Sequence, residues 1–260
     1  MFSKPMLVCQ LPETWDYVDI HPFGDLHIGA KNCAMDLIRK HIDMLAKDKR
    51  ARIFLMGDII NNGVKSSVTN VYEEALTPGE QKRQAQEMLE PLRDKIIGIV
   101  AGNHENRTYR DVDQDVMWDI AHHLDLEEVY CKDKGIIYIS LGRKAKNGKN
   151  QVYVGKFTHG AGGGMYIGSG ANRQERYIAA TEGVDFVMSG HTHKPFYAPI
   201  SREVADSTRK KVFQRLSMIM TGTAWLYHGG YADEKMLSPV PIAPNKLRLY
   251  GHDKIMEGIG

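Results

Sequence analysis

Four mostly apolar segments of the chain, five to seven residues long, are each followed directly by a glycine. They cover residues 17–23, 52–56, 95–101 and 185–189. Short apolar runs that end in a turn residue are typical of buried β-strands. The sequence therefore predicts four strands whose carboxyl ends lead into glycine turns.

Elsewhere in the first half of the chain, apolar residues recur every three or four positions, as on one face of an α-helix. One helix is predicted at residues 32–47 with Asn32 as its N-cap, and a second should begin near Pro78 and be disturbed at Pro91. A third helix is predicted at 113–124, and residues 61–78 between the first two are predicted to form a loop.

From Gly135 onward the apolar pattern alternates, as in β-strands. Residues 136–141 and 151–158 predict a hairpin, with Asn147-Gly148 as its tight turn. A short helix is predicted at 172–180, and a further strand pair at 194–200 and 212–221, with Leu216, Met218 and Met220 facing inward. Two sheets stacked between helical layers accommodate these elements. The predicted fold is α/β, a four-layer α/β/β/α sandwich of two stacked mixed sheets flanked by helices.

The chain of 260 residues is long enough for one large core, so a single domain over residues 1–260 is predicted, although length alone leaves a two-domain division open. Residues 225–260 read as a C-terminal tail because glycines and three prolines argue against regular structure there. Within this tail, residues 246–250 predict one edge strand. A lid and a homodimer contact are the roles left open for the tail.

The composition is that of an ordinary globular protein, with 42% hydrophobic and 25% charged residues and a net charge of +2. The N-terminal apolar run of Met6, Leu7 and Val8 is too short for a signal peptide or a membrane span. The three cysteines have no metal-ligand spacing and fit a reducing compartment. We therefore expect a cytoplasmic protein without a membrane partner.

Five scattered segments carry side chains that bind metals. They are Gly24-Asp25-Leu26-His27, Gly57-Asp58, Gly102-Asn103-His104-Glu105, Thr158-His159-Gly160 and Gly190-His191-Thr192-His193. Each segment alone is weak evidence, because single histidines and strand-end aspartates are common, but their joint occurrence is specific. Two cations about 3.5–4 Å apart need a bridging group, which a carboxylate supplies. Imidazole, carboxylate and amide oxygen together favour two divalent ions, manganese first, with iron, zinc or nickel as alternatives.

This series of segments resembles the calcineurin-like metallophosphoesterase superfamily over about residues 16–222. The resemblance implies the four-layer fold described above. It also implies that a metal-bridging hydroxide attacks the phosphorus. His104 would then face the substrate, as a proton donor or as a partner for phosphate charge, oriented by Asp58, Asp25 or a backbone carbonyl. The implied ligands are Asp25, His27 and His193 for one metal, Asn103, His159 and His191 for the other, and Asp58 as the bridge.

The substrate is predicted from differences within that superfamily. Residues 57–63, Gly-Asp-Ile-Ile-Asn-Asn-Gly, lack the second Asp and the Arg of phosphoserine phosphatases, which disfavours a protein phosphatase. The series also resembles phosphodiesterases, DNA-repair nucleases and short phage-encoded members. We therefore expect a phosphodiester substrate such as DNA, RNA or a nucleotide. Arg107 is a candidate phosphate contact, with a solvated arginine as the alternative.

Several basic clusters could follow a nucleic-acid backbone, although basic turns are usually solvated. Residues Gly162-Gly163-Gly164 predict a flexible loop beside His159 that gates substrate entry. Two other functions stay open: a phosphomonoesterase, and a non-catalytic scaffold, which ranks last because no ligand is lost. The basic residues are Arg143, Lys144, Lys146, Lys149, Arg173, Arg176, Arg209, Lys210 and Lys211.

Overall fold

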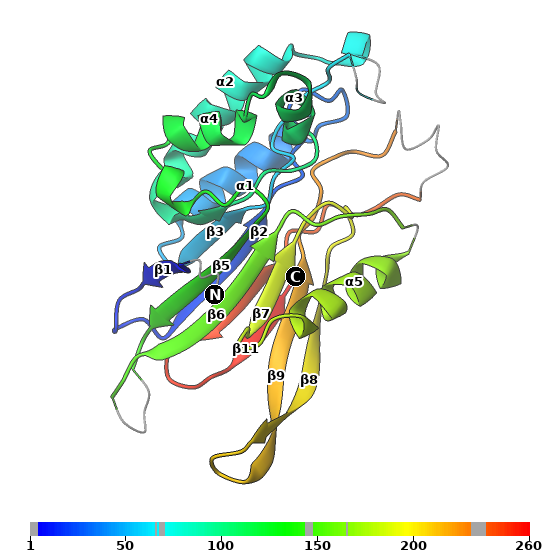
Figure 1. Ribbon diagram of the computed structural model, residues 1–260. Helices are drawn as coiled ribbons and strands as arrows, with labels where there is room; N and C mark the ends of the chain where they lie inside the picture. The colour runs from blue at the N-terminus through cyan, green and yellow to red at the C-terminus, as the bar shows by residue number, and fades with distance from the viewer. Residues whose placement is uncertain (1–4, 66, 68–70, 144–147, 165, 230–237) are drawn as a thin grey trace.

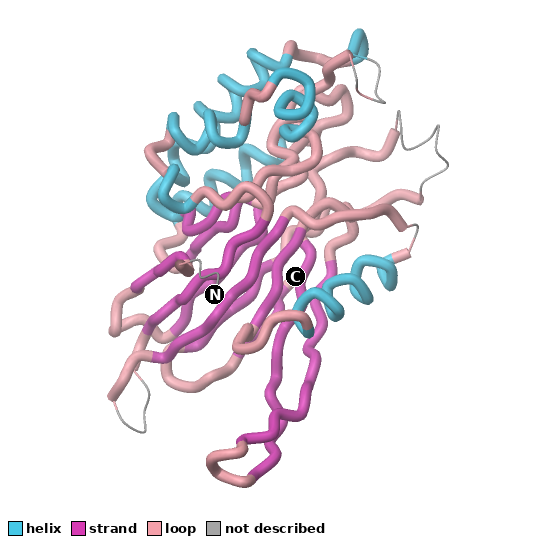
Figure 2. The backbone as a smooth tube through the Cα atoms, in the orientation of Figure 1, coloured by secondary structure: helices cyan, strands magenta, loops and turns pink. Residues whose placement is uncertain are grey.

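Two β-sheets packed face to face form the centre of the computed structural model, and helices cover their outer faces (Figures 1 and 2). The structure describes residues 5–65, 67, 71–143, 148–164, 166–229 and 238–260. The predicted four-layer α/β/β/α arrangement is confirmed. Among the described residues, no helix has the length and the apolar character needed to cross a bilayer.

The five-stranded sheet has the order β11-β10-β2-β3-β4. Strands β2 (Tyr17–Phe23), β3 (Ala51–Leu55) and β4 (Ile96–Ile99) are parallel and match three of the predicted strands. Strand β10 (Lys246–Tyr250) is antiparallel to β2, and β11 (Met256–Ile259) pairs with its other side. The prediction of a strand at 246–250 is thus confirmed, but its placement at the sheet edge is wrong because β11 covers it.

The six-stranded sheet has the order β1-β5-β6-β7-β9-β8. It consists of β1 (Leu7–Gln10), β5 (Lys134–Leu141), β6 (Gln151–Thr158), β7 (Phe186–Ser189), β8 (Phe196–Asp206) and β9 (Lys211–Thr221). Strands β5 and β6 form the predicted antiparallel hairpin. In its predicted turn, Asn147 lies outside the described residues, and Gly148 has a φ of +65°.

Strands β8 and β9 pair along their whole length and extend beyond the other strands as a two-stranded ribbon (Figure 1). Met218 and Met220 are buried, as predicted, but Leu216 is 50% exposed. The prediction for Leu216 is wrong because the pair continues past the sheet, where no described residue buries this side chain.

The helices of the first half cover the five-stranded sheet. They are α1 (Met35–Lys47), η1 (Val71–Glu73), α2 (Pro78–Leu89), η2 (Glu90–Lys95), α3 (Glu105–Val112), α4 (Val116–His123) and η3 (Glu127–Val129). As predicted, α2 gives way to a 3₁₀ turn at Pro91. Residues 61–78 are not all loop, because they contain η1. Helix α5 (Ile167–Ala179), which starts five residues earlier than predicted, packs on the six-stranded sheet through Ile178.

Two predicted helix starts are wrong. Asn32 does not cap α1, because its side-chain nitrogen instead donates to the carbonyl of Tyr227 at 2.6 Å. The helix predicted at 113–124 begins at Val116, because Asp113 has a φ of +57° and ends the unpredicted α3. Asp115 caps α4 by accepting from the N–H of Trp118 at 3.0 Å.

The space between the sheets is filled mainly by aromatic and aliphatic side chains from both of them. The rings of Phe54 and Phe157 stack with centroids 4.5 Å apart. A Cβ atom at Gly98 of the five-stranded sheet would lie 2.5 Å from the Phe157 ring of the other sheet, so glycine is required for this close approach. The sheets are therefore locked face to face, which fixes the relative positions of their strand ends.

Candidate metal centre

The predicted ligands follow five strands at the edge where the carboxyl ends of both sheets meet. Asp25 and His27 follow β2, Asp58 follows β3 and Asn103 follows β4. In the other sheet, His159 follows β6, and His191 and His193 follow β7. This is the edge at which open α/β sheets bind ligands. The structure brings all seven predicted ligands together there.

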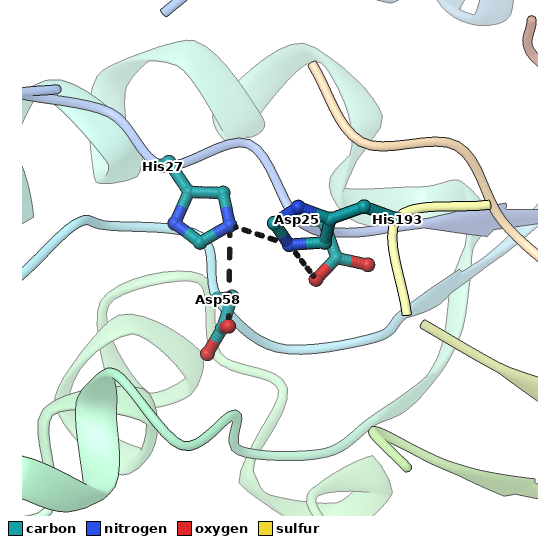
Figure 3. A group of neighbouring side chains, drawn as sticks. All are labelled: Asp25, His27, Asp58 and His193. Carbon is teal, nitrogen blue, oxygen red and sulfur yellow. Dashed lines mark hydrogen bonds and ion pairs between the residues drawn. The ribbon is translucent and has the colours of Figure 1, made fainter. Parts of the chain in front are cut away.

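One group consists of Asp25, His27, Asp58 and His193, shown in Figure 3. One nitrogen or oxygen atom from each lies within 4.8 Å of the corresponding atoms of the others. His193 Nε2 is 3.1 Å from His27 Nε2 and 3.4 Å from Asp25 Oδ1. His27 Nε2 is 4.0 Å from Asp58 Oδ2. These atoms converge on one point, as ligands of a single ion would.

A second group contains Asp58, His159 and His191. His159 Nε2 lies 3.4 Å from Asp58 Oδ2 and 3.2 Å from His191 Nδ1. The side-chain oxygen of Asn103 is 3.0 Å from that His159 nitrogen and 2.7 Å from His191 Nδ1. Asp58 therefore belongs to both groups, in the place that a bridging carboxylate would take.

Other hydrogen bonds orient the histidine rings. His27 Nδ1 is 3.3 Å from the side-chain oxygen of Asn61, and His159 Nδ1 donates to the carbonyl of Met56 at 2.6 Å. In both residues Nε2 is left to face the centre. Such contacts at the outer nitrogen fix the tautomer and the direction of a metal-binding histidine.

Backbone strain is concentrated at the same residues. Asp25, His27, Asp58, His191 and His193 all have a positive φ, between 48° and 68°. Non-glycine residues rarely adopt this left-handed conformation, which costs of order 1–3 kcal/mol per residue and is found mainly at functional sites. Five of the seven predicted ligands share it, which supports a functional site independently of their chemistry.

Glu105 was not singled out from the sequence, although it belongs to one of the quoted segments. Its buried carboxylate accepts hydrogen bonds from the N–H groups of Asp58, Ile59, Ile60 and Gly102, at 2.7–3.2 Å. It thus ties the turn that carries Asp58 to the turn that carries Asn103. Its sequence signal is an acidic residue at the first position of a helix, directly after a candidate ligand segment.

His104 lies beside the centre, with Nε2 3.8 Å from Asp58 Oδ2. Its Nδ1 is 2.7 Å from the carbonyl oxygen of Asn61, so a backbone carbonyl orients the ring, as one of the predicted options stated. Arg107 donates to His104 Nε2 at 3.0 Å and to the same carbonyl at 3.0 Å. In this arrangement His104 is neutral, and the Arg107 guanidinium lies within the site.

The electrostatics of the centre favour positive charge. Burial opposes ionisation of Asp58, but His159 and His104 outweigh it and hold the pKa of Asp58 well below its usual value. Burial likewise opposes the charged form of His159, yet the Asp58 and Asp25 carboxylates raise its pKa to about 10. Burial raises the pKa of Glu105 to about 7, and its four N–H donors favour the ionised form. The buried carboxylates of Asp58 and Glu105 thus place negative charge at the centre, and this charge attracts cations.

The donor set fits two divalent transition-metal ions. It combines two carboxylates, four imidazoles and one amide oxygen, without thiolates. Among the described residues, Cys9, Cys33 and Cys131 form no disulfide, and they belong to neither ligand group. Burial raises the pKa of Cys33 to about 12, and its Sγ donates to the carbonyl of Leu26. Its thiol is therefore a structural donor.

The predicted basic clusters lie in different environments. Arg143 pairs with Glu13, and Arg209 with Asp206, while Lys144 and Lys146 lie outside the described residues. No ion pair joins Arg173 or Arg176 of α5 to any residue that the structure describes. Lys210 and Lys211 at the β8–β9 turn also lack an ion pair among the described residues, but Arg173 and Arg176 lie on α5, next to the strand ends that carry the ligand histidines.

Comparison with protein families agrees with this centre, because the matched residues include all seven proposed ligands. A family model described as calcineurin-like phosphoesterase matches residues 20–195. No curated protein matches the chain. Among solved structures, a conserved uncharacterized protein and predicted phosphoesterase from Streptococcus pneumoniae is 10% identical, with 94% of this chain and 97% of that chain covered and a TM-score of 0.39.

Two further solved structures are similar to this chain. A metallophosphoesterase from Sphaerobacter thermophilus is 14% identical, with 90% of this chain and 87% of that chain covered and a TM-score of 0.40. A Pseudomonas putida nuclease is 12% identical, with 92% and 87% covered and a TM-score of 0.36. The family match covers more than half of the chain.

Proposed function

Because this chain belongs to the calcineurin-like phosphoesterase family, we propose that it is a two-metal phosphodiesterase acting on a nucleic acid or a nucleotide. The observation that carries the proposal is the position of Asp58, which is shared by two groups of converging ligand atoms. A shared carboxylate between two such groups is the arrangement that a binuclear centre requires.

The ligand roles proposed are those implied by the resemblance. Asp25, His27 and His193 would hold one divalent cation, while Asn103, His159 and His191 would hold the other. Asp58 would bridge them, with manganese as the favoured metal. When bound, the cation pair supplies Lewis acidity to the phosphoryl oxygens and to the attacking water. Hydrogen bonds orient three of these ligands: Glu105 holds the turn of Asp58, Asn61 contacts His27, and the carbonyl of Met56 contacts His159.

His104 and Arg107 are proposed to act on the substrate as a pair. Their shared contact, 3.0 Å from Arg107 Nη2 to His104 Nε2, places a guanidinium and an imidazole together beside Asp58. Arg107 would bind a phosphate oxygen. With Arg107 turned to the phosphate, His104 Nε2 would be free to take up a proton from water and pass it to the leaving oxygen, or, once protonated, to add to the hydrogen bonds that hold the phosphate.

A diester rather than a monoester is supported by the segment after Asp58. The positions that carry Asp and Arg in phosphoserine phosphatases are Asn61 and Asn62 here. Asn62 donates to the carbonyl of His104 at 2.7 Å, so its side chain is used inside the protein. Among the described residues, Arg107 is the arginine whose guanidinium contacts His104 at the centre. It suits the single charge of a diester better than a monoester dianion.

The test compares hydrolysis of bis-p-nitrophenyl phosphate with that of p-nitrophenyl phosphate in added Mn²⁺, using Asp58→Asn as the matched control. We expect metal-dependent diester turnover that Asp58→Asn abolishes. Preference for the monoester would replace this proposal by a phosphomonoesterase. No metal-dependent turnover of either ester would contradict the proposal as stated and leave an enzyme of narrow specificity or the non-catalytic scaffold.

A further inference from the structure

A groove of about 440 Å³ lies beside the metal centre, between α5 and the ends of β6 and β7. Its lining includes Gly160, Gly190 and Thr192, each of which adjoins a proposed ligand histidine in the chain. Its volume falls within the roughly 300–1,000 Å³ of small-molecule sites and exceeds what one phosphate needs. The groove therefore has room for a group attached to a phosphate at the centre.

The lining of the groove is mostly apolar, with Val187 on β7 and Tyr177 on α5 among its residues. Arg173 and Arg176 lie along the same helix and also line it, and none of the described lining residues is acidic. Being three positions apart, the two arginines lie on neighbouring parts of one helix face. This combination suits a ligand with flat, weakly polar groups and more than one negative charge.

Two buried polar atoms belong to residues of the groove wall. Gln174 is 6% exposed and donates through Nε2 to the carbonyl of Met220 at 3.0 Å, which fixes the orientation of its amide. Its Oε1 and the hydroxyl of Thr192 have no hydrogen-bond partner among the described residues. Unsatisfied buried polar atoms are uncommon and require an explanation.

Gly160 and Ala161, at the start of the loop at 160–164, also line the groove. Arg173 donates to the carbonyls of Ala161 and Gly162, and Lys194 Nζ is 3.3 Å from the carbonyl oxygen of Gly164. Contacts from α5 and from the segment after β7 thus hold this loop beside His159. The groove and the metal centre share this loop as a common wall.

We infer that this groove binds single-stranded nucleic acid next to the scissile phosphate, with a base on its apolar floor and phosphates at Arg173 and Arg176. The inference rests on the proposed diesterase function and names its substrate class. Bases of a duplex are stacked and paired, so they cannot enter a groove of this kind, whereas unpaired bases can.

The first test measures binding without catalysis. Fluorescence anisotropy with a labelled single-stranded oligothymidylate in EDTA compares the wild type with the double variant Arg173→Gln/Arg176→Gln. We expect the double variant to bind about tenfold more weakly. Its slope of log Kd against log salt should fall by about 1.4, since each phosphate contact to a single strand contributes about 0.7. The matched control is Arg39→Gln/Arg83→Gln, which removes the same charge from exposed positions on α1 and α2. It should bind as the wild type does.

The second test compares kcat/KM for the oligonucleotide with kcat/KM for bis-p-nitrophenyl phosphate in Mn²⁺. The ratio of the two should fall about tenfold in the groove variant, because KM for the oligonucleotide rises. In the control variant the ratio should stay at its wild-type value. An unchanged ratio would contradict the groove inference, and so would cleavage of a duplex at the same rate as a single strand. Neither result would contradict the proposed diesterase function. If the wild type cleaves only the small diester, the groove inference is also wrong. If it cleaves neither, the proposed function itself fails.

Discussion

At the scale of single residues, Glu105 determines whether the two halves of the centre stay together. Among the described residues, its carboxylate accepts hydrogen bonds from four backbone N–H groups in two different turns. The Glu105→Gln substitution keeps the size but replaces one acceptor oxygen by an NH₂ group that faces N–H donors. We expect a loss of about 2–3 kcal/mol in the free energy of unfolding, because buried donors lose a charged partner. Metal affinity should fall about 10–100-fold.

Urea unfolding and metal titration measure these two effects of Glu105→Gln. The matched control is Glu87→Gln on the exposed side of α2, which should change the free energy of unfolding by less than about 0.5 kcal/mol. Equal stability of the two variants would show that Glu105 does not hold the turns.

A second prediction at this scale separates the two roles of His104. A proton donor assists only leaving groups that need a proton, whereas a phosphate contact assists every substrate equally. If His104 is the acid, His104→Ala should lose about 10²–10⁴-fold in kcat on alkyl diesters and much less on p-nitrophenyl esters. Metal content should be unchanged in this variant. Equal losses on both kinds of ester would assign His104 to phosphate binding alongside Arg107.

The sequence was most informative at the residue scale, for a physical reason. Metal ligands must be particular side chains at strand ends, so Asp25, Asp58 and His191 stand out from their surroundings. The seven predicted ligands lie together in the structure, while their occupancy by metal stays a prediction. Glu105 could not be assigned from the sequence, because its role depends on backbone N–H groups that only the fold brings within reach.

At the scale of elements, burial pattern predicted strands better than helix starts or sheet positions. Strand β2 was predicted with its observed bounds, because apolar runs reflect burial directly. The start of α1 was not, because Asn32 is used by Tyr227, far away in the chain. The interior place of β10 depends on β11, whose four residues Met-Glu-Gly-Ile have little strand pattern of their own.

The attachment of β10 to β2 gives a testable prediction of pH dependence. Asp19 of β2 is buried and pairs with Lys246 and Arg248 of β10 at 2.7 Å. Burial opposes its ionised form, but the Arg248 and Lys246 contacts outweigh this and lower the pKa of Asp19. The pair therefore stabilises the fold above the unfolded pKa of about 3.9, and this contribution is lost as pH falls through the folded pKa.

We expect Asp19→Asn to lower the free energy of unfolding by about 2–3 kcal/mol at pH 7, since two cations lose their buried partner. The difference from the wild type should narrow as pH falls below about 4. Urea unfolding at pH 7, 5 and 3.5 measures this. A difference that stays constant over this range would mean that Asp19 acts through packing rather than charge.

At the scale of the whole molecule, the proposed metal centre takes ligands from both sheets, and the apolar core between the sheets packs them together. Asp25, His27, Asp58 and Asn103 come from the five-stranded sheet, and the three other proposed ligands from the six-stranded sheet. Cations that bind this set would bind only when both sheets are folded and packed. The fold class was predictable because alternating strands and helices of this length have few ways to bury their apolar faces.

This shared construction predicts that metal binding stabilises the entire fold. A ligand that binds only the folded state adds about 2.7 kcal/mol at a concentration 100 times its Kd. Added Mn²⁺ should therefore raise the midpoint of thermal unfolding by several degrees in one cooperative transition, and EDTA should reverse the rise. His27→Ala and His191→Ala remove one ligand from each sheet, and each should reduce the shift. A Mn²⁺ shift that is equally large in Asp58→Asn would place the ions elsewhere, whereas two separate transitions would show that the sheets unfold independently.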